Sequence, residues 1–282
     1  MVAKPIIWFS EIANRDLNIV GGKGFNLAVM YNLKLPVPPG FVVTTTSYKF
    51  FLDENNLKTK IKNILKNLDV EDTEKLQDAS KGIQNLILDV EVPELVKKAI
   101  VDAYEDLNVD RVVSKVLGDK SNALSSFIKA GRDLPFVAVR SSANFEDSPE
   151  FSFAGQQETY LNVRGKEEVV VAVQKCWASL FTARAIYYRV RNNIPHEKVL
   201  IAVVLQKMVN SEVSGVLFSA NPVTNNQEEI MMEAAFGLGE VVVGGQITPD
   251  NYILDKKSLN IKSKKIARQE YGLFRDVYTG NT

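Results

Sequence analysis

The sequence predicts a mixed α+β fold of two lobes, with a helical insert inside the first lobe. Short β-branched runs bounded by Gly and Pro recur along the chain, which is typical of strands. A stretch at about residues 55–130 instead has apolar residues at helical spacing. An Asn- and Pro-containing break at residues 192–195 separates a predicted helix from a further set of strands, so we place the lobes at residues 1–195 and 196–282.

The first lobe begins with a glycine-rich turn at residues 21–24 that opens an apolar helical stretch. A proline-rich segment then leads into a predicted strand at residues 41–45. After the helical insert, strands are predicted at residues 137–140 and 159–163. The polar loop that joins them is longer than a connection needs. An amphipathic helix over residues 167–190 completes the lobe.

The second lobe is predicted to consist mostly of strands. The runs with the length and β-branched content of strands are residues 199–207, 214–220, 229–234 and 252–255. A glycine-rich turn at residues 236–240 follows the third run. The chain length of 282 residues agrees with two lobes, since a domain takes roughly 150 residues.

Composition and charge exclude several classes of protein. The chain is 45% hydrophobic and 24% charged, which is ordinary for a globular protein and excludes a disordered one. Its 34 basic residues balance 34 acidic residues, so no overall positive field favours nucleic acid. No apolar run reaches the length of a signal-peptide core or a membrane span. We therefore expect neither nucleic acid nor a membrane as a partner.

A single cysteine and a single histidine restrict the chemistry. Cys176 cannot form an internal disulfide or a cysteine-rich zinc site, and it fits a reducing, cytoplasmic compartment. His196 alone cannot make a multi-histidine metal site, and we expect it at the surface of a linker. The side chains left for chemistry are those of lysine, arginine, glutamine and the acidic residues.

Two positively charged side chains are candidates for binding an anion. Lys23 lies in the Gly-Gly-Lys-Gly turn at residues 21–24, where backbone N–H groups and the lysine both attract negative charge. The alternative is a tight turn with an exposed lysine, because neither common phosphate-loop pattern matches. Arg140 ends a predicted strand, where its guanidinium could bind phosphate bidentately. Its alternative is an ion pair with Glu146 or Asp147.

Three further residues, which carry no positive charge, are candidates for a ligand-binding site. Gly155 lies in a loop with small residues and aromatics, which could close over a polyphosphate or simply form a turn. Gln206 follows an apolar strand and could read an adenine edge, although a glutamine at a strand end is ordinarily solvated. Glu233 lies inside an apolar strand, where a carboxylate is costly unless it is paired or ligating, so functional and structural roles stay equally open.

Taken together, these segments resemble the N-terminal nucleotide-binding domain shared by phosphoenolpyruvate synthases, pyruvate phosphate dikinases and rifampicin phosphotransferases. The resemblance covers nearly all of the chain outside the helical insert. It is carried by the ordered blocks VGGKGFNL, PVPPGFVVTT, VAVRSSANFEDSPEFSFAGQQETYLNV, CWASLFTARAIYYR, LQKMV, SGVLFSANPVT, EAAFGLGE and GGQITPDNY. The wording of CWASLF, LQKMV and TPDNY is most similar to phosphoenolpyruvate synthase, followed by rifampicin phosphotransferase. The resemblance implies an ATP-grasp fold, in which two α+β lobes hold ATP between two sheets.

The resemblance also implies roles for individual residues. The matching positions that would bind ATP are Lys23, Arg140, Gly155, Thr159, Gln206, Glu233 and Glu240. Lys23 and Arg140 would also act in catalysis, by neutralising charge on the transferred phosphoryl group. Gly155 would lie in a loop that excludes water, and Gln206 would lie near the adenine. The loop departs mildly from the family's usual sequence at Asn144, Phe145 and Ser148.

Some parts of the family pattern are absent from this sequence. The family's metal-binding glutamate and a Gln-Ser-Arg-Pro block would follow Thr282, so we expect a second lobe that is truncated at its C-terminal end and a metal ligand outside this chain. The family's phosphohistidine domain and its pyruvate- and PEP-binding domain would also lie outside it. We therefore expect a fragment of a larger enzyme, inactive alone.

The resemblance implies a parent enzyme that makes phosphoenolpyruvate from pyruvate, ATP and water, with Mg²⁺ as a cofactor. This chain would phosphorylate a histidine on a separate swivelling domain, and AMP and phosphate would be released. Two alternatives keep the nucleotide site and change the acceptor: a rifampicin phosphotransferase and a pyruvate phosphate dikinase. A third alternative is a stand-alone module that senses nucleotide and acts through the helical insert.

Overall fold

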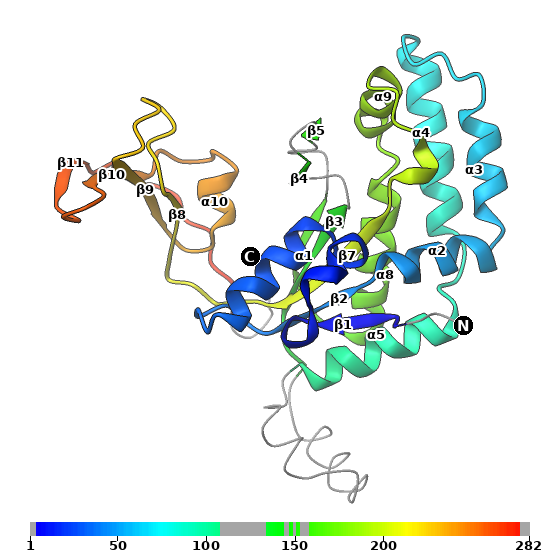
Figure 1. Ribbon diagram of the computed structural model, residues 1–282, viewed down its shortest axis with the longest axis horizontal. Helices are drawn as coiled ribbons and strands as arrows, with labels where there is room; N and C mark the ends of the chain where they lie inside the picture. Colours follow the sequence, from blue (N-terminus) through cyan, green and yellow to red (C-terminus); the bar gives the residue numbers. More distant parts are fainter. Residues whose placement is uncertain (1–3, 108–133, 144–146, 149–150, 153–157, 277–282) are drawn as a thin grey trace, which may run out of the picture. The chain divides into compact units, whose positions relative to one another are not determined.

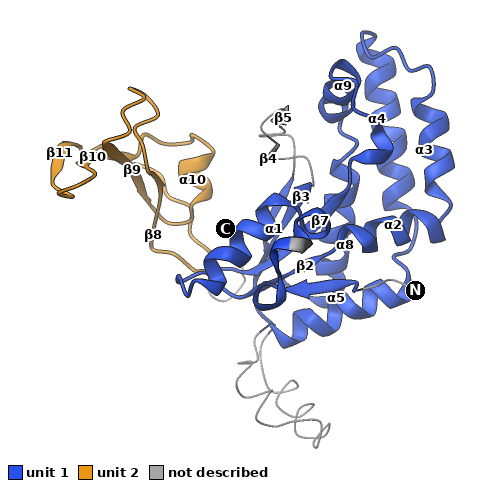
Figure 2. Cartoon of the chain, viewed as in Figure 1, with its two compact units in different colours: residues 1–208 blue, residues 209–282 orange. Residues whose placement is uncertain are grey.

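The structure, a computed structural model, describes residues 4–107, 134–143, 147–148, 151–152 and 158–276 (Figure 1). The chain forms two compact units, residues 1–208 and residues 209–282 (Figure 2). The sequence predicts this boundary between residues 195 and 196. The units divide later because strand β7, Ile201–Lys207, is the middle strand of the first unit's sheet.

Five antiparallel strands form the sheet of the first unit, in the order β1-β2-β7-β3-β6. Their bounds are Ile6–Trp8 for β1, Gly40–Val43 for β2, Val137–Ala143 for β3, Thr159–Val163 for β6 and Ile201–Lys207 for β7. Two residues each form the separate pair β4, Asp147–Ser148, and β5, Phe151–Ser152. The first five residues of β7 are buried, as expected for an apolar run that is paired on both sides.

Helices cover the two faces of this sheet unequally (Figure 1). On one face, Val20 of helix α1, Leu17–Asn32, packs with Val42 and Val204 in a small core. The other face carries a larger core. The helices that contribute to it are α2 Thr45–Glu54, α3 Leu57–Leu65, α4 Thr73–Leu88, α5 Glu94–Asp106, α8 Lys166–Ser179 and α9 Ala183–Arg191. Helices α3 to α5 lie within the range of the predicted insert, and residues 108–133 of that range lie outside the described residues.

The single helix predicted over residues 167–190 is two helices, α8 and α9. The second begins anew because the Thr182 hydroxyl accepts a hydrogen bond from the backbone N–H of Ala185 at 3.2 Å, which caps α9. By length and composition alone, the combined stretch Lys166–Arg191 could cross a membrane. Since 72% of its apolar window is buried inside the protein, it has the character of a core helix.

The second unit contains a four-stranded antiparallel sheet in the order β11-β10-β9-β8. Its strands are β8 Val213–Phe218, β9 Glu229–Phe236, β10 Asp250–Asp255 and β11 Ile261–Lys265, and a short helix α10, Glu240–Val243, packs against β8 and β9. Strand β11 was not predicted, because its sequence IKSKK is mostly polar and has the character of a loop. All five of its residues are exposed. Antiparallel sheets with helices in both units confirm the α+β class.

Candidate functional site

One face of the first unit's sheet gathers most of the predicted residues of that unit. Arg140 on β3 is paired with Thr159 on β6 and with Val204 on β7, so these three side chains share a face. Gln206 follows Val204 by two positions on β7 and therefore points to the same side. Val204 packs beneath α1, the helix that carries Lys23. Residues from four separate segments thus meet on the α1 face.

The lysine of the glycine-rich turn contacts the strand beside Arg140. Nζ of Lys23 donates a hydrogen bond to the carbonyl oxygen of Ser141 at 3.1 Å, across 118 positions of sequence. Ser141 directly follows Arg140 on β3. The two cationic side chains that the sequence predicts for phosphate are therefore brought to the same part of the sheet, where their fields add at any bound anion.

Ser142 fastens the glycine-rich turn to the strand. Its hydroxyl donates to the carbonyl oxygen of Val20 at 3.0 Å and accepts from the backbone N–H of Gly24 at 3.2 Å. Ser142 is fully buried, so both bonds are shielded from water. Sequence reasoning did not select Ser142. The available signal was the polar pair Ser141-Ser142 directly after Arg140 in an otherwise apolar strand.

Gly21 allows the turn to approach the strand closely. Its φ of 70° and ψ of 169° lie in a region that glycine alone adopts readily. A Cβ at this position would lie 2.4 Å from both the carbonyl oxygen and the hydroxyl oxygen of Ser142. The kink at Gly21 also starts a new helical segment at residue 22, where backbone N–H groups carry the positive end of the helix dipole.

Arg140 is half-buried on the α1 face. Within the part of the chain that the structure describes, no carboxylate forms an ion pair with it. The alternative predicted from the sequence, a pair with Glu146 or Asp147, is not tested, because Glu146 lies outside the described residues and only the backbone of Asp147 is described. A guanidinium on this face has the geometry to form a charge-assisted bond to an incoming anion.

Gln206 joins the end of β7 to the proline-rich segment before β2. Its Nε2 donates to the carbonyl oxygen of Pro38 at 3.2 Å, and the next backbone N–H, of Lys207, donates to Pro39 at 3.0 Å. The side-chain amide is thus oriented by the protein rather than simply solvated. Thr159, which is exposed, lies on the same face two strands away.

The remaining predicted residues are Gly155, Glu233 and Glu240. Gly155 lies outside the described residues. Glu233 is half-buried on β9, between Val216 of β8 and Asn251 of β10, and Glu240 is exposed at the first position of α10. Both glutamates belong to the second unit, which is described by itself. Their participation in a site with Arg140 stays a prediction.

The described residues offer few ligands for Mg²⁺. They contain no group of three or more His, Cys, Asp or Glu side chains that could hold a metal ion. Mg²⁺ commonly binds through one or two carboxylates together with substrate phosphates and water. A magnesium ion at this face would therefore depend on the phosphates of a nucleotide.

Comparison with known proteins identifies the family of the chain. The family model described as the pyruvate phosphate dikinase AMP/ATP-binding domain matches residues 17–281. This range includes α1, the sheet of the first unit and nearly all of the second unit. The chain therefore belongs to this family and is an ATP-binding domain.

Its relatives confirm the resemblance found in the sequence. The chain is 49% identical to a probable phosphoenolpyruvate synthase of Methanocaldococcus jannaschii, over 97% of the chain and 21% of the relative. It is 41% identical to a phosphoenolpyruvate synthase of Pyrococcus furiosus, over 99% of the chain and 36% of the relative. The chain is 44% identical to a phosphoenolpyruvate synthase of Aeropyrum pernix, over 98% of the chain and 32% of the relative. The chain thus spans only about a fifth to a third of the length of these curated relatives.

Proposed function

We propose that the chain is the ATP-binding part of a phosphoenolpyruvate synthase, and that it transfers a phosphoryl group from ATP to a histidine on a separate swivelling domain. A pyruvate- and PEP-binding domain of the same parent enzyme would then pass this phosphoryl group to pyruvate to form phosphoenolpyruvate. Water would be consumed overall, so that the other two phosphoryl groups of ATP leave in AMP and in inorganic phosphate. The names of the relatives support this reaction. The observation that carries it is the hydrogen bond of the Lys23 ammonium to β3 beside Arg140.

The proposed fold is an ATP-grasp, with ATP held between the sheets of the two units. Each unit has an antiparallel sheet, which supports this fold. Glu233 and Glu240 would line the cleft from the second unit. The family's metal-binding glutamate and closing strand would be supplied by further sequence of the parent enzyme, whose relatives are about three to five times as long as the matched part.

The proposed chemistry depends on positioned positive charge. Lys23 and Arg140 would bind the phosphates and stabilise the charge that develops on the transferred group. Because Lys23 is already held by Ser141 and its turn by Ser142, little reorganisation is needed on binding. Thr159 would contact the nucleotide beside Arg140, the Gly155 loop would exclude water, and Gln206 would lie near the adenine. Mg²⁺, when bound to the phosphates, would neutralise part of their charge.

The remaining parts of the proposal follow from composition and from the relatives. We propose a cytoplasmic enzyme, because a lone buried Cys176 suits a reducing compartment. The partner surfaces would be the phosphohistidine domain and the pyruvate- and PEP-binding domain of the parent enzyme.

The test has two steps. Thermal-shift titration of the chain with ATP, AMP and GTP, each with and without Mg²⁺, measures nucleotide binding, since a ligand of the native state raises the melting temperature. The full-length parent enzyme is then assayed with ATP and either pyruvate or rifampicin. We expect the largest stabilisation with ATP, and phosphoenolpyruvate formation from pyruvate. Phosphorylation of rifampicin instead of pyruvate, or activity independent of any histidine domain, would contradict the proposal.

A further inference from the structure

A cavity of about 590 Å³ lies within the first unit, on the side of the sheet opposite the α1 face. Helices α2 and α3 and the segment that connects α9 with β7 enclose it. Its apolar walls belong to the larger core and include Leu52, Ile61, Phe181 and Val199. This volume is within the range of small-molecule sites, about 300–1,000 Å³. The cavity is independent of the proposed ATP site, because Lys23 and Arg140 belong to the other face.

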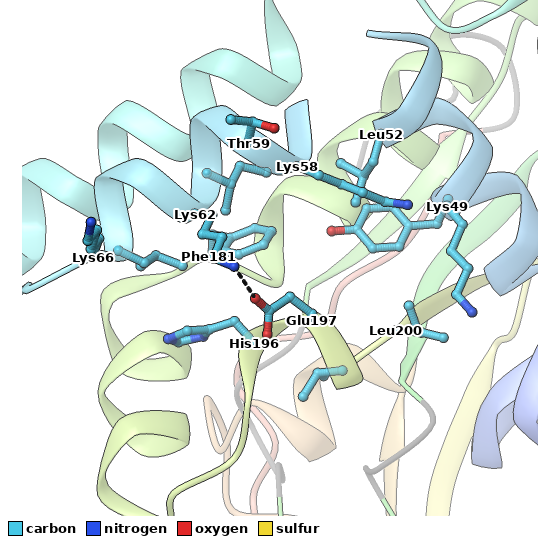
Figure 3. Close-up of a pocket in the computed structure, with 14 residues that line it drawn as sticks. Lys49, Leu52, Lys58, Thr59, Lys62, Lys66, Phe181, His196, Glu197 and Leu200 are labelled. Carbon is cyan, nitrogen blue, oxygen red and sulfur yellow. Dashed lines mark ion pairs between the residues drawn. The ribbon is translucent and has the colours of Figure 1, made fainter. Parts of the chain in front are cut away.

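The entrance of the cavity is strongly basic. Four lysines line it, Lys49, Lys58, Lys62 and Lys66, against one carboxylate, that of Glu197 (Figure 3). Glu197 faces Lys62 at 3.9 Å, a loose ion pair between exposed side chains. Lys58 is paired with Asp53 at 2.5 Å. An excess of positive charge around an apolar interior favours a ligand with a negative head and an apolar body.

A buried guanidinium lies directly behind the lining residues. Arg189 of α9 is fully buried, and neither Nη1 nor Nη2 has a hydrogen-bond partner. Its Nε donates to Nδ1 of His196 at 2.9 Å, and its Cζ lies 5.3 Å from the centre of the Phe181 ring. Both of these neighbours line the cavity. No acidic side chain of the described residues pairs with Arg189, although a buried charge without a counter-ion costs several kcal/mol.

The histidine between Arg189 and the cavity cannot supply the missing negative charge. Burial, and secondly the charge of Arg189, lower the pKa of His196 from 6.5 to about 4, so the ring is neutral at pH 7. Burial likewise lowers the pKa of Arg189 to about 10, which leaves it charged at pH 7. His196, expected from the sequence at the surface, is instead half-buried between a cation and a cavity. The local charge balance is therefore positive.

We propose that this cavity binds a small amphipathic carboxylate, whose apolar body lies along Leu52, Ile61 and Phe181 and whose carboxylate is attracted by Arg189 and the lysines of the entrance. A linear medium-chain acid matches the apolar walls and the excess of positive charge around them. The neutral alcohol of the same chain length lacks the group that this charge attracts.

The test uses His196 as the reporter, because it is the only histidine of the 282-residue chain. Ring ¹⁵N and ¹H shifts of His196 are recorded at pH 7.5 during titration with decanoate, and separately with decanol. The entrance variant Lys62→Gln with Lys66→Gln is compared with Lys60→Gln, an exposed lysine of α3 that does not line the cavity. Thr59→Trp places a bulky ring at the entrance from an exposed position, so folding is preserved.

We expect a saturable shift of the His196 signals with decanoate and binding at least tenfold weaker with decanol. The double lysine variant should bind decanoate about two- to thirtyfold more weakly, which is the range for the loss of two exposed charges, and Lys60→Gln should bind as the parent does. Thr59→Trp should abolish the shift. Equal effects of decanol and decanoate, no saturable shift, or an unchanged shift in Thr59→Trp would each overturn the proposal.

Discussion

The close approach of the glycine-rich turn to β3 predicts that Gly21→Ala is severely destabilising. Backbone strain at φ 70°, ψ 169° costs a non-glycine residue about 1–3 kcal/mol. The added Cβ would also lie 2.4 Å from the carbonyl and hydroxyl oxygens of Ser142, so the turn must move and the Ser142 hydrogen bonds must weaken. The combined cost is on the order of 3 kcal/mol, and ATP binding should weaken because Lys23 moves with the turn.

The matched control is Gly82→Ala on α4. There a Cβ meets nothing within 4 Å, and the position is inside a regular helix. Alanine should stabilise this site by about 0.5–1 kcal/mol, since it lacks the conformational freedom of glycine in the unfolded chain. Replacing glycine by alanine is thus expected to lower the free energy of unfolding at residue 21 and to raise it at residue 82.

The assay is urea unfolding followed by tryptophan fluorescence. Both tryptophans, Trp8 and Trp177, belong to the first unit, so the signal reports that unit alone. Gly21→Ala should lower the urea midpoint and Gly82→Ala should raise it at constant slope. A Gly21→Ala midpoint equal to that of the parent would refute the reasoning about the turn.

Three further predictions concern the same unit. Ser142→Ala should lower the free energy of unfolding by about 1–3 kcal/mol, because it leaves the buried N–H of Gly24 without a partner. It should also weaken ATP binding. Equal urea midpoints for the variant and the parent would contradict the predicted loss of stability. Lys23→Ala should weaken ATP binding, measured by calorimetry, without a large loss of stability. If the affinity for ATP is unchanged, the turn has only a structural role. Because the folded-state pKa of His196 is lowered to about 4 from 6.5, the folded protein disfavours the charged ring. The unfolded chain therefore binds a proton at His196 that the folded protein does not bind, and the free energy of unfolding falls as the pH is lowered from 6.5 towards 4. Over this pH range, the urea midpoints of the parent should fall more steeply than those of His196→Gln.

The candidate cationic residues could be selected from the sequence, because they lie in short, recognisable blocks. Lys23 was selected from a glycine-rich turn and Arg140 from a predicted strand end, and the structure brings them to one face. The expected strand end is wrong, because β3 continues to Ala143 and Arg140 lies at its middle. Strand β6 also has the predicted bounds. These features depend on local pattern, which a single sequence carries.

Other features depend on contacts between distant segments, and these could not be predicted. Ser142 acts on a turn 122 positions away, and an isolated serine in a strand gives no sign of that partner. The division of the units after residue 208 depends on β7 pairing with β2 and β3, which no local pattern specifies. His196 was expected at the surface because its neighbours are polar, whereas Arg189, seven positions earlier, forms a hydrogen bond with it in a partly buried position.

The proposed function requires that the α1 face holds the phosphates of ATP through Arg140 and Lys23. Isothermal titration calorimetry of ATP into Arg140→Ala tests it most directly, with Lys98→Ala as a control that removes one exposed positive charge from α5. Loss of a charge-assisted hydrogen bond of roughly 1.5–3 kcal/mol should weaken binding by roughly ten- to hundredfold in Arg140→Ala and leave Lys98→Ala like the parent. If Arg140→Ala binds ATP as tightly as Lys98→Ala does, the phosphates are not held at this face.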